Sequence, residues 1–252
     1  MPDLPGARSP FECTMMDLRG WARTSLIDFP GHIATVLFTG GCDFRCPMCH
    51  NRDLVLNPTA LPPVDPTDVL AFVARRAGKV TGVVVTGGEP LLQPDLASFL
   101  AALREHDVAI KLDTNGNHPA SLAVLLDAGL VDYVAMDVKA PPDKYGLLTG
   151  RPTLDVARPA ASVELLCRSG VACEFRTTVV PGLLDGDDIE AVAGWLAGVG
   201  GAAIPYVLQQ FRGAHTLDPF LEGRAPYAVD ELEAMADRAR RRLDDVVVRG
   251  VA

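Results

Sequence analysis

Three cysteines crowd into one short segment of the chain. Cys42, Cys46 and Cys49 form the pattern CxxxCxxC within GGCDFRCPMCHN. Closely spaced thiolates are soft ligands that suit zinc or an iron–sulfur cluster. A structural zinc site needs four protein ligands, and the nearest further candidate is His50, which is adjacent to Cys49 and diverges from it. A [4Fe–4S] cluster held by three cysteines keeps one iron open to a small molecule. The spacing favours such a cluster, and zinc remains the alternative.

Five further motifs combine glycine with polar residues. They are TGGEP (86–90), DTNG (113–116), MDVK (136–139), RTTVVPG (176–182) and LQQF (208–211). Taken alone, TGGEP reads as a turn that ends a strand, and DTNG reads as an Asx turn. Asp137 and Lys139 would share one face of a strand and could form only an ion pair. Their chemistry therefore depends on whether the fold brings them together.

The segments that must position these motifs alternate in type from about residue 33 onward. Short β-branched runs alternate with amphipathic ones, which is typical of βα units around a parallel sheet. The expected strands span 33–39, 82–86, 108–113, 133–137, 172–179, 203–209 and 246–249. The cysteine segment and the other motifs each lie where one of the first six strands ends, so they should line one cavity. About six βα units predict an α/β fold, either an incomplete barrel or an open doubly wound sheet.

Helices are marked by the spacing of apolar residues and by caps. Apolar side chains at helical spacing predict helices across 96–103, 189–196 and 232–243. Asp65 before Pro66 is a helix start, and Gly170 after Ser169 is a C-cap glycine. Without a repeat or a long linker, residues 1–252 are expected to form a single domain, with 1–20 as a loose leader.

Composition excludes several classes of protein. The 252 residues are 48% hydrophobic, enough for a sizeable core, and 23 Lys and Arg against 32 Asp and Glu give a net charge of −9. An acidic chain argues against nucleic-acid binding, which depends on basic residues at phosphates. The first residues lack the pattern of a signal peptide, and no apolar run has the length of a membrane span. We therefore expect a cytoplasmic protein with no membrane partner.

The remaining candidate ligands receive structural interpretations. Six cysteines are too few for a disulfide scaffold, so Cys167 and Cys173 are expected as small buried hydrophobes and Cys13 in the leader. The other histidines lack ligand spacing and are expected on the surface, and both tryptophans are expected to pack: His32, His106, His118, His215, Trp21 and Trp195. His50 could hydrogen-bond near a cluster or cap the following helix.

The ordered set of motifs resembles the radical S-adenosylmethionine (SAM) superfamily. Its hallmark is CxxxCxxC on the loop after the first strand of a partial (βα)6 barrel. Within it the chain is similar to the glycyl-radical-enzyme activating proteins, above all those that activate anaerobic ribonucleoside-triphosphate reductase. The segments that carry this likeness are TSLIDFPGHIATVLFTGGCDFRCPMCHN, KLDTNG, VDYVAMDVKAP, EFRTTVVPG and YVLQQF. The resemblance covers nearly the whole chain and implies a partial barrel with parallel strands.

The resemblance also implies roles for particular residues. Cys42, Cys46 and Cys49 would ligate three irons, and SAM would chelate the fourth. Gly87, Gly88 and Glu89 match the motif that receives the methionyl amino group. Residues around the SAM carboxylate, where a monovalent cation can also lie, would be Asp113, Thr114, Asp137 and Lys139. Arg176 would face that carboxylate or the ribose, and Gln209 is a further candidate. Met48 stands where many relatives place an aromatic residue beside the adenine.

The implied function is reductive cleavage of SAM to a 5′-deoxyadenosyl radical, which takes a hydrogen atom from a glycine Cα of a partner glycyl radical enzyme. The leftover cysteines lack the spacing for further clusters, so electrons are expected from an external donor such as flavodoxin or ferredoxin. One alternative is a radical SAM enzyme that acts on a small molecule or a peptide. Another is a non-catalytic binding module stabilised by a metal.

Overall fold

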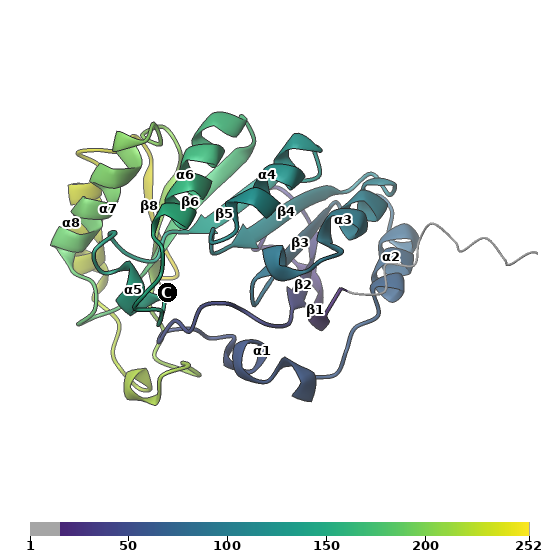
Figure 1. Cartoon of the computed structure of the whole chain (residues 1–252), viewed down its shortest axis with the longest axis horizontal. Coiled ribbons are helices and arrows are strands. Elements are labelled where there is room, and N and C mark those ends of the chain that lie inside the picture. Colours follow the sequence, from purple (N-terminus) through teal and green to yellow (C-terminus); the bar gives the residue numbers. More distant parts are fainter. Residues whose placement is uncertain (1–15, 252) are drawn as a thin grey trace, which may run out of the picture.

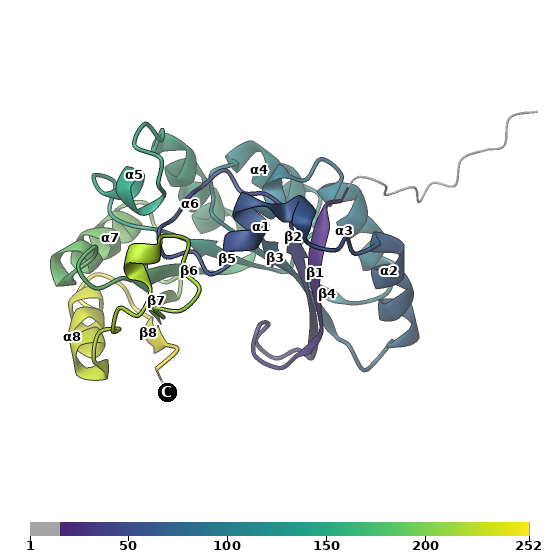
Figure 2. The same cartoon turned by 90° about the horizontal axis from the view of Figure 1, so that it is seen from below.

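The computed structural model describes residues 16–251, which form one eight-stranded sheet flanked by helices (Figures 1 and 2). The strands lie side by side in sequence order, from β1 to β8. β1 (Leu18–Ser25) pairs antiparallel with β2 (Ala34–Thr39), and every later pair is parallel. The predicted partial barrel of parallel strands is therefore confirmed, with one antiparallel strand added at its first edge.

The parallel strands lie close to their predicted positions. They are β2, β3 (Gly82–Gly87), β4 (Ala109–Thr114), β5 (Tyr133–Asp137), β6 (Ala172–Val179), β7 (Tyr206–Gln210) and β8 (Val246–Arg249). The largest difference is at β7, which we expected from residue 203. The strand begins only after Pro205, because proline cannot donate a ladder hydrogen bond.

The helices connect successive strands. They are α1 (Arg52–Leu56), α2 (Pro66–Arg75), α3 (Leu96–Arg104), α4 (Pro119–Asp127), α5 (Tyr145–Leu148), α6 (Ala157–Ser169), α7 (Gly186–Gly198) and α8 (Val229–Ala239), with short 3₁₀ turns at Pro58–Ala60, Pro90–Leu92 and Pro219–Leu221. Asp65 caps α2 by accepting a hydrogen bond from the Thr67 N–H at 2.8 Å, as predicted. Gly170 ends α6 with φ +70°, in the left-handed region that favours glycine.

The two faces of the sheet differ in chemistry. On β6, Phe175 is fully buried in the main core with residues of α6 and α7, whereas its neighbours Glu174 and Arg176 point to the other face and form ion pairs there. This follows from the two-residue period of a strand. The outer face and the helices thus form the main apolar core. The inner face carries a small apolar cluster at Ala34, Val36 and Val84, and charged side chains on the strands beyond it.

The sequence did not predict β1. Residues 1–15, with Cys13, lie outside the described part of the chain, but Leu18–Gly20 of the expected leader belong to β1. Gly20 and two arginines obscure the apolar alternation of this strand. Trp21 packs as expected: its indole N–H donates to Thr35 Oγ1 at 2.7 Å and its ring lies 5.2 Å from that of Phe72. Within residues 16–251, no helix is long and apolar enough to cross a membrane.

Candidate active site

The cysteine loop leaves the carboxyl end of β2 and runs across the sheet to the loops that follow β5 and β7 (Figure 1). The Arg45 N–H donates to the Thr149 carbonyl at 2.8 Å, just after α5. The Asp218 N–H, in the loop after β7, donates to the Pro47 carbonyl at 2.9 Å. The loop is therefore held over the end of the sheet at which the polar motifs meet.

The three thiols of this loop are free and partly or fully buried. Burial raises the pKa of Cys42 to about 12 and that of Cys46 to about 11, and it also raises the pKa of Cys49. The positive charge of Lys139 opposes this rise at Cys46 and Cys49. Without metal the thiols therefore stay neutral at physiological pH, and a bound metal would displace their protons.

The glycines of TGGEP allow β3 to end against the cysteine loop. A Cβ on Gly88 would lie 1.8 Å from the Gly41 carbonyl oxygen, and one on Gly87, which has φ +116°, would lie 2.3 Å from the Thr39 nitrogen. The Glu89 N–H donates to the same Gly41 carbonyl at 2.8 Å. A side chain at Gly88 would displace the loop that carries Cys42, and one at Gly87 would displace the end of β2, from which that loop leaves.

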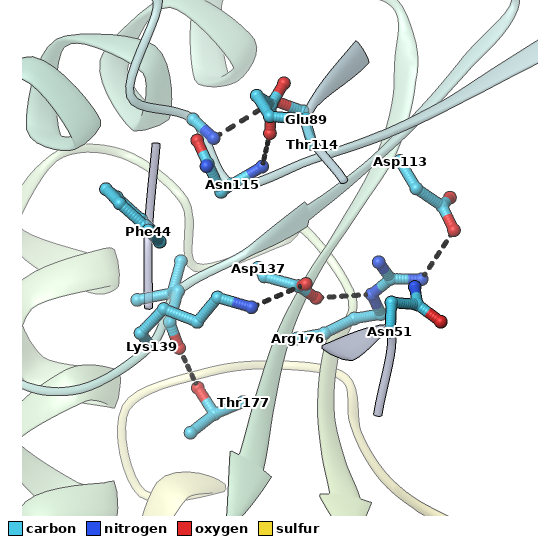
Figure 3. A network of polar contacts seen from close by, with 12 residues as sticks. Phe44, Asn51, Glu89, Asp113, Thr114, Asn115, Asp137, Lys139, Arg176 and Thr177 are labelled. Carbon is cyan, nitrogen blue, oxygen red and sulfur yellow. Dashed lines mark hydrogen bonds and ion pairs between the residues drawn. The ribbon is translucent and has the colours of Figure 1, made fainter. Parts of the chain in front are cut away.

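Glu89 is fully buried and binds the loop that follows β4 (Figure 3). Its carboxylate accepts hydrogen bonds from Thr114 Oγ1 at 2.8 Å, from the Asn115 N–H at 2.7 Å and from the Leu91 N–H at 3.0 Å. Burial raises the pKa of Glu89 to about 7, although these hydrogen bonds act in the opposite direction. The carboxylate thus joins TGGEP to DTNG.

Five charged side chains form a continuous chain along β4, β5 and β6. Figure 3 shows four of them, Asp113, Arg176, Asp137 and Lys139. Asp113 pairs with Lys111 at 2.5 Å and with Arg176 at 3.4 Å. Arg176 also pairs with Asp137 at 2.9 Å, and Asp137 pairs with Lys139 at 2.8 Å. Burial alone would raise the pKa of Asp137, but the charges of Arg176 and Lys139 hold it well below its usual range. Three cations against two carboxylates leave one positive charge for an anionic ligand.

Most of the residues predicted for the site lie together, but two do not join its polar network. The charge chain contains Asp113, Asp137, Lys139 and Arg176, while Thr114 binds Glu89. Gln209 instead donates to the Arg249 carbonyl at 3.3 Å, toward β8. Met48 is buried with 6% of its surface exposed and belongs to the apolar core. Roles for these two residues remain predictions.

Several polar residues that shape the site were not predicted from the sequence. Lys111 is buried in the charge chain, and Asn51 donates to the Gly87 carbonyl at 2.9 Å. His118, expected on the surface, is only 17% exposed and contacts Asp43. Burial would raise the pKa of Asp43, but hydrogen bonds from His118, Asn117 and Asn115 hold it well below its usual range. Only their adjacency to CxxxCxxC and DTNG could have indicated them.

The zinc alternative finds no ready site in the described residues. Across 16–251, no three His, Cys, Asp or Glu side chains are placed to hold a metal ion. His50 does not cap α1: its Nε2 lies 2.8 Å from the Arg212 carbonyl oxygen, in the loop after β7. A hydrogen bond of His50 near a cluster stays a prediction. Three thiols without a fourth protein ligand suit a cluster whose irons each take a separate cysteine.

Comparison with known proteins places this geometry in context. The model of the Radical SAM superfamily matches residues 36–196. A Methanocaldococcus jannaschii protein named as a glycyl-radical enzyme activating enzyme is 31% identical over 232 residues, which cover 90% of this chain and 93% of that protein. The pyruvate formate-lyase-activating enzyme of Clostridium pasteurianum is 29% identical over 234 residues, which cover 87% of this chain and 91% of that enzyme.

Solved structures share the fold. A domain of a pyruvate-formate lyase-activating enzyme from Bacteroides vulgatus superimposes with a TM-score of 0.55 at 15% identity, covering 67% of this chain and 99% of that one. Streptococcus suis SuiB bound to its precursor peptide SuiA superimposes with a TM-score of 0.65 at 16% identity, covering 85% of this chain and 48% of that one. At this identity the likeness concerns the fold alone.

The cofactors that the matched superfamily implies are a [4Fe–4S] cluster and SAM, and the residues present fit both. Three free thiols on one loop provide ligands for three irons. The surplus positive charge beside them suits the carboxylate of a bound amino acid. Asp113 and Asp137, beside which the resemblance places a monovalent cation, already carry ion pairs with Lys111, Arg176 and Lys139. The monovalent cation remains a prediction.

Proposed function

This chain belongs to the radical SAM superfamily and, within it, to the glycyl-radical-enzyme activating proteins, and from that premise we propose that it activates an anaerobic ribonucleoside-triphosphate reductase. The observation that carries the proposal is the position of the cysteine loop, which lies over a chain of partly buried charged residues. The segments EFRTTVVPG and YVLQQF favour this partner, because they resemble the activating proteins of that reductase.

When bound, the cluster and SAM would supply the chemistry, which is reductive cleavage of SAM to methionine and a carbon-centred radical able to abstract a hydrogen atom from a partner glycine. The protein positions these groups and excludes water. The cysteines bind the irons, and Arg176 and Lys139 supply positive charge for the methionyl carboxylate. Glu89, which already accepts three hydrogen bonds, holds the DTNG loop in place beside the proposed site for the methionyl amino group.

Pyruvate formate-lyase is the second candidate partner. It is favoured by the names of relatives such as the Clostridium pasteurianum enzyme, which aligns with 87% of this chain. Both partners would present a glycine-bearing loop to the same end of the sheet. In either case we propose an external donor such as flavodoxin or ferredoxin, because Cys167 and Cys173 lack the spacing of a second cluster.

The test is electron paramagnetic resonance of the partner. The anaerobically reconstituted protein, photoreduced flavodoxin and SAM are mixed with an anaerobic reductase or with a pyruvate formate-lyase from the same source. We expect a glycine-centred doublet in the reductase that is absent when SAM is omitted. A doublet in the lyase alone would move the assignment to that partner.

Two other outcomes would contradict the activating role itself. SAM cleavage that proceeds only with an added small molecule or peptide, and without a glycyl radical, would favour a different radical SAM reaction. A chain that binds one zinc and never cleaves SAM would be a binding module. The Cys173→Ser variant, altered on the outer face of the sheet, is the matched control for loss of a thiol away from the site.

A further inference from the structure

The Asp43 carboxylate lies next to Cys42 in the cysteine loop, and three side chains of one other segment converge on it. Asn115 Nδ2 donates to Oδ1 at 2.9 Å, Asn117 Nδ2 donates to Oδ2 at 2.5 Å, and His118 Nε2 lies 3.0 Å from Oδ2. All three partners belong to the loop between β4 and α4. The side chain of Asp43 is only 15% exposed, so these contacts replace most of its water.

Asn115 links the Asp43 carboxylate to Cys42 and to Glu89. Its Nδ2 lies 3.8 Å from Cys42 Sγ, within hydrogen-bonding distance of sulfur. Its backbone N–H donates to Glu89, and its Oδ1 accepts from the Asn117 N–H at 2.9 Å. Rotation of this side chain would break several hydrogen bonds at once, so its amide is fixed toward Cys42.

If Asp43 were removed, few other groups could replace its hydrogen bonds. A buried carboxylate needs several donors to offset its lost hydration, and buried amide donors need an acceptor. Asn117 Oδ1 is already buried without a hydrogen-bond partner in the described structure. Removal of Asp43 would therefore leave two buried amides and His118 without their shared acceptor.

We propose that Asp43, Asn115, Asn117 and His118 form a latch that positions Cys42 for the cluster and places a fixed negative charge beside the iron it binds. Partners outside the ligand sphere of a metal orient its ligands, and net charge near a cluster sets its reduction potential. A fixed negative charge favours the oxidised cluster. The latch thus acts on the cluster through Cys42 as a set of positioning residues. This inference rests on a cluster at Cys42, and not on which partner glycine is activated.

The positioning half of the proposal is tested without the cluster, by hydrogen exchange of the apoprotein. In Asp43→Ala we expect the amides of Phe44 and Arg45, which bond to Cys42 Sγ and to the Thr149 carbonyl, to exchange about tenfold faster or more. The matched control is Asp132→Ala. Asp132 likewise accepts hydrogen bonds, from the Ile110 N–H at 2.7 Å and Arg104 at 2.9 Å, but at the opposite end of the sheet. This control should leave the loop protected.

The electrostatic half is tested on the reconstituted protein by redox titration. Asp43→Asn keeps an acceptor oxygen but removes the charge, so the midpoint potential should shift to a more positive value while most of the loop protection remains. Asp43→Ala should in addition weaken retention of iron by about 10- to 100-fold. Asp132→Ala should change neither quantity, even if it lowers thermal stability.

A second variant keeps the proposal testable if Asp43→Ala fails to fold. Asn117→Ala combined with His118→Ala removes two donors but keeps the charge, so loop exchange should accelerate without a positive shift in potential. Loop exchange in Asp43→Ala or in the double variant that matches the wild type would overturn the positioning role. A midpoint potential in Asp43→Asn equal to that of the wild type would overturn the electrostatic one. Dithionite-driven SAM cleavage in the wild type reports the radical SAM activity independently.

Discussion

The two faces of the sheet are built from the same strands but carry different kinds of side chain. On β6, Phe175 lies fully buried among apolar residues on the outer face, while the adjacent Arg176 pairs with Asp113 and Asp137 on the inner face. On β6, outer positions stabilise the fold through apolar burial, whereas inner positions hold charged side chains. One strand can therefore carry stability and function on alternate residues, and substitutions on the two faces should have separable effects.

The two sides of the sheet should differ most when a cysteine of the loop and a cysteine of the outer face are each replaced. Cys46→Ser removes a predicted iron ligand and should abolish both the brown [4Fe–4S] absorbance and SAM cleavage. Cys173→Ser, on the outer face of β6, should keep both at near wild-type levels with a modest loss of stability. Iron analysis and production of 5′-deoxyadenosine measure the difference. Equal iron content in the two variants would break the distinction between the faces.

Adjacent residues on β6 should separate stability from ligand binding. Phe175→Ala should cost about 3–5 kcal/mol of unfolding free energy, because it leaves a cavity in the core, with little change in the dissociation constant for SAM. Arg176→Met leaves Asp113 paired with Lys111 and Asp137 paired with Lys139. It should therefore melt near the wild type but bind SAM about 10- to 100-fold more weakly. Urea unfolding measures the stability of each variant, and calorimetric titration measures its affinity for SAM. Weaker SAM binding in Phe175→Ala, or a large stability loss in Arg176→Met, would contradict the prediction.

Glu89 predicts a pH dependence of the apoprotein. Its pKa is raised by burial from 4.5 to about 7, so the folded state binds more protons than the unfolded state between these values. Stability should therefore fall as pH rises from about 4.5 to 7, by about 3 kcal/mol from this group. Glu89→Gln should lack this component of the fall. The measurement is urea unfolding of both proteins at several pH values, and parallel curves would contradict the prediction.

The smallest expected effect lies on the helical layer. Gly170→Ala places a Cβ in open space but in the left-handed region, so it should cost about 1–2 kcal/mol of stability and leave SAM binding unchanged. Gly88→Ala, whose Cβ would meet the Gly41 carbonyl, should instead lower iron retention. Thermal melting and iron analysis distinguish the two glycines. Iron loss in Gly170→Ala would show that the helical layer and the site are not separable.

The sequence predicted the repeated elements better than the contacts between loops. Strand positions follow from runs rich in apolar and β-branched residues, and β5, β6 and β8 have the predicted bounds. CxxxCxxC and the strand-end motifs could be placed at one end of the sheet by topology alone. Asn117 and His118 could not, because their shared partner Asp43 is more than 70 residues away in sequence and no spacing rule links them. β1 was missed because pairing with β2, rather than its own pattern, makes it a strand.

We propose that this protein transfers a hydrogen atom from a partner glycine to the product of SAM cleavage. The direct measurement uses an anaerobic ribonucleoside-triphosphate reductase whose glycines carry deuterium at Cα, together with reduced protein and unlabelled SAM. Mass spectrometry should find 5′-deoxyadenosine with one added deuterium, in step with the glycyl radical signal. If 5′-deoxyadenosine forms while the partner is present but carries no deuterium, the proposed activation of this enzyme is wrong.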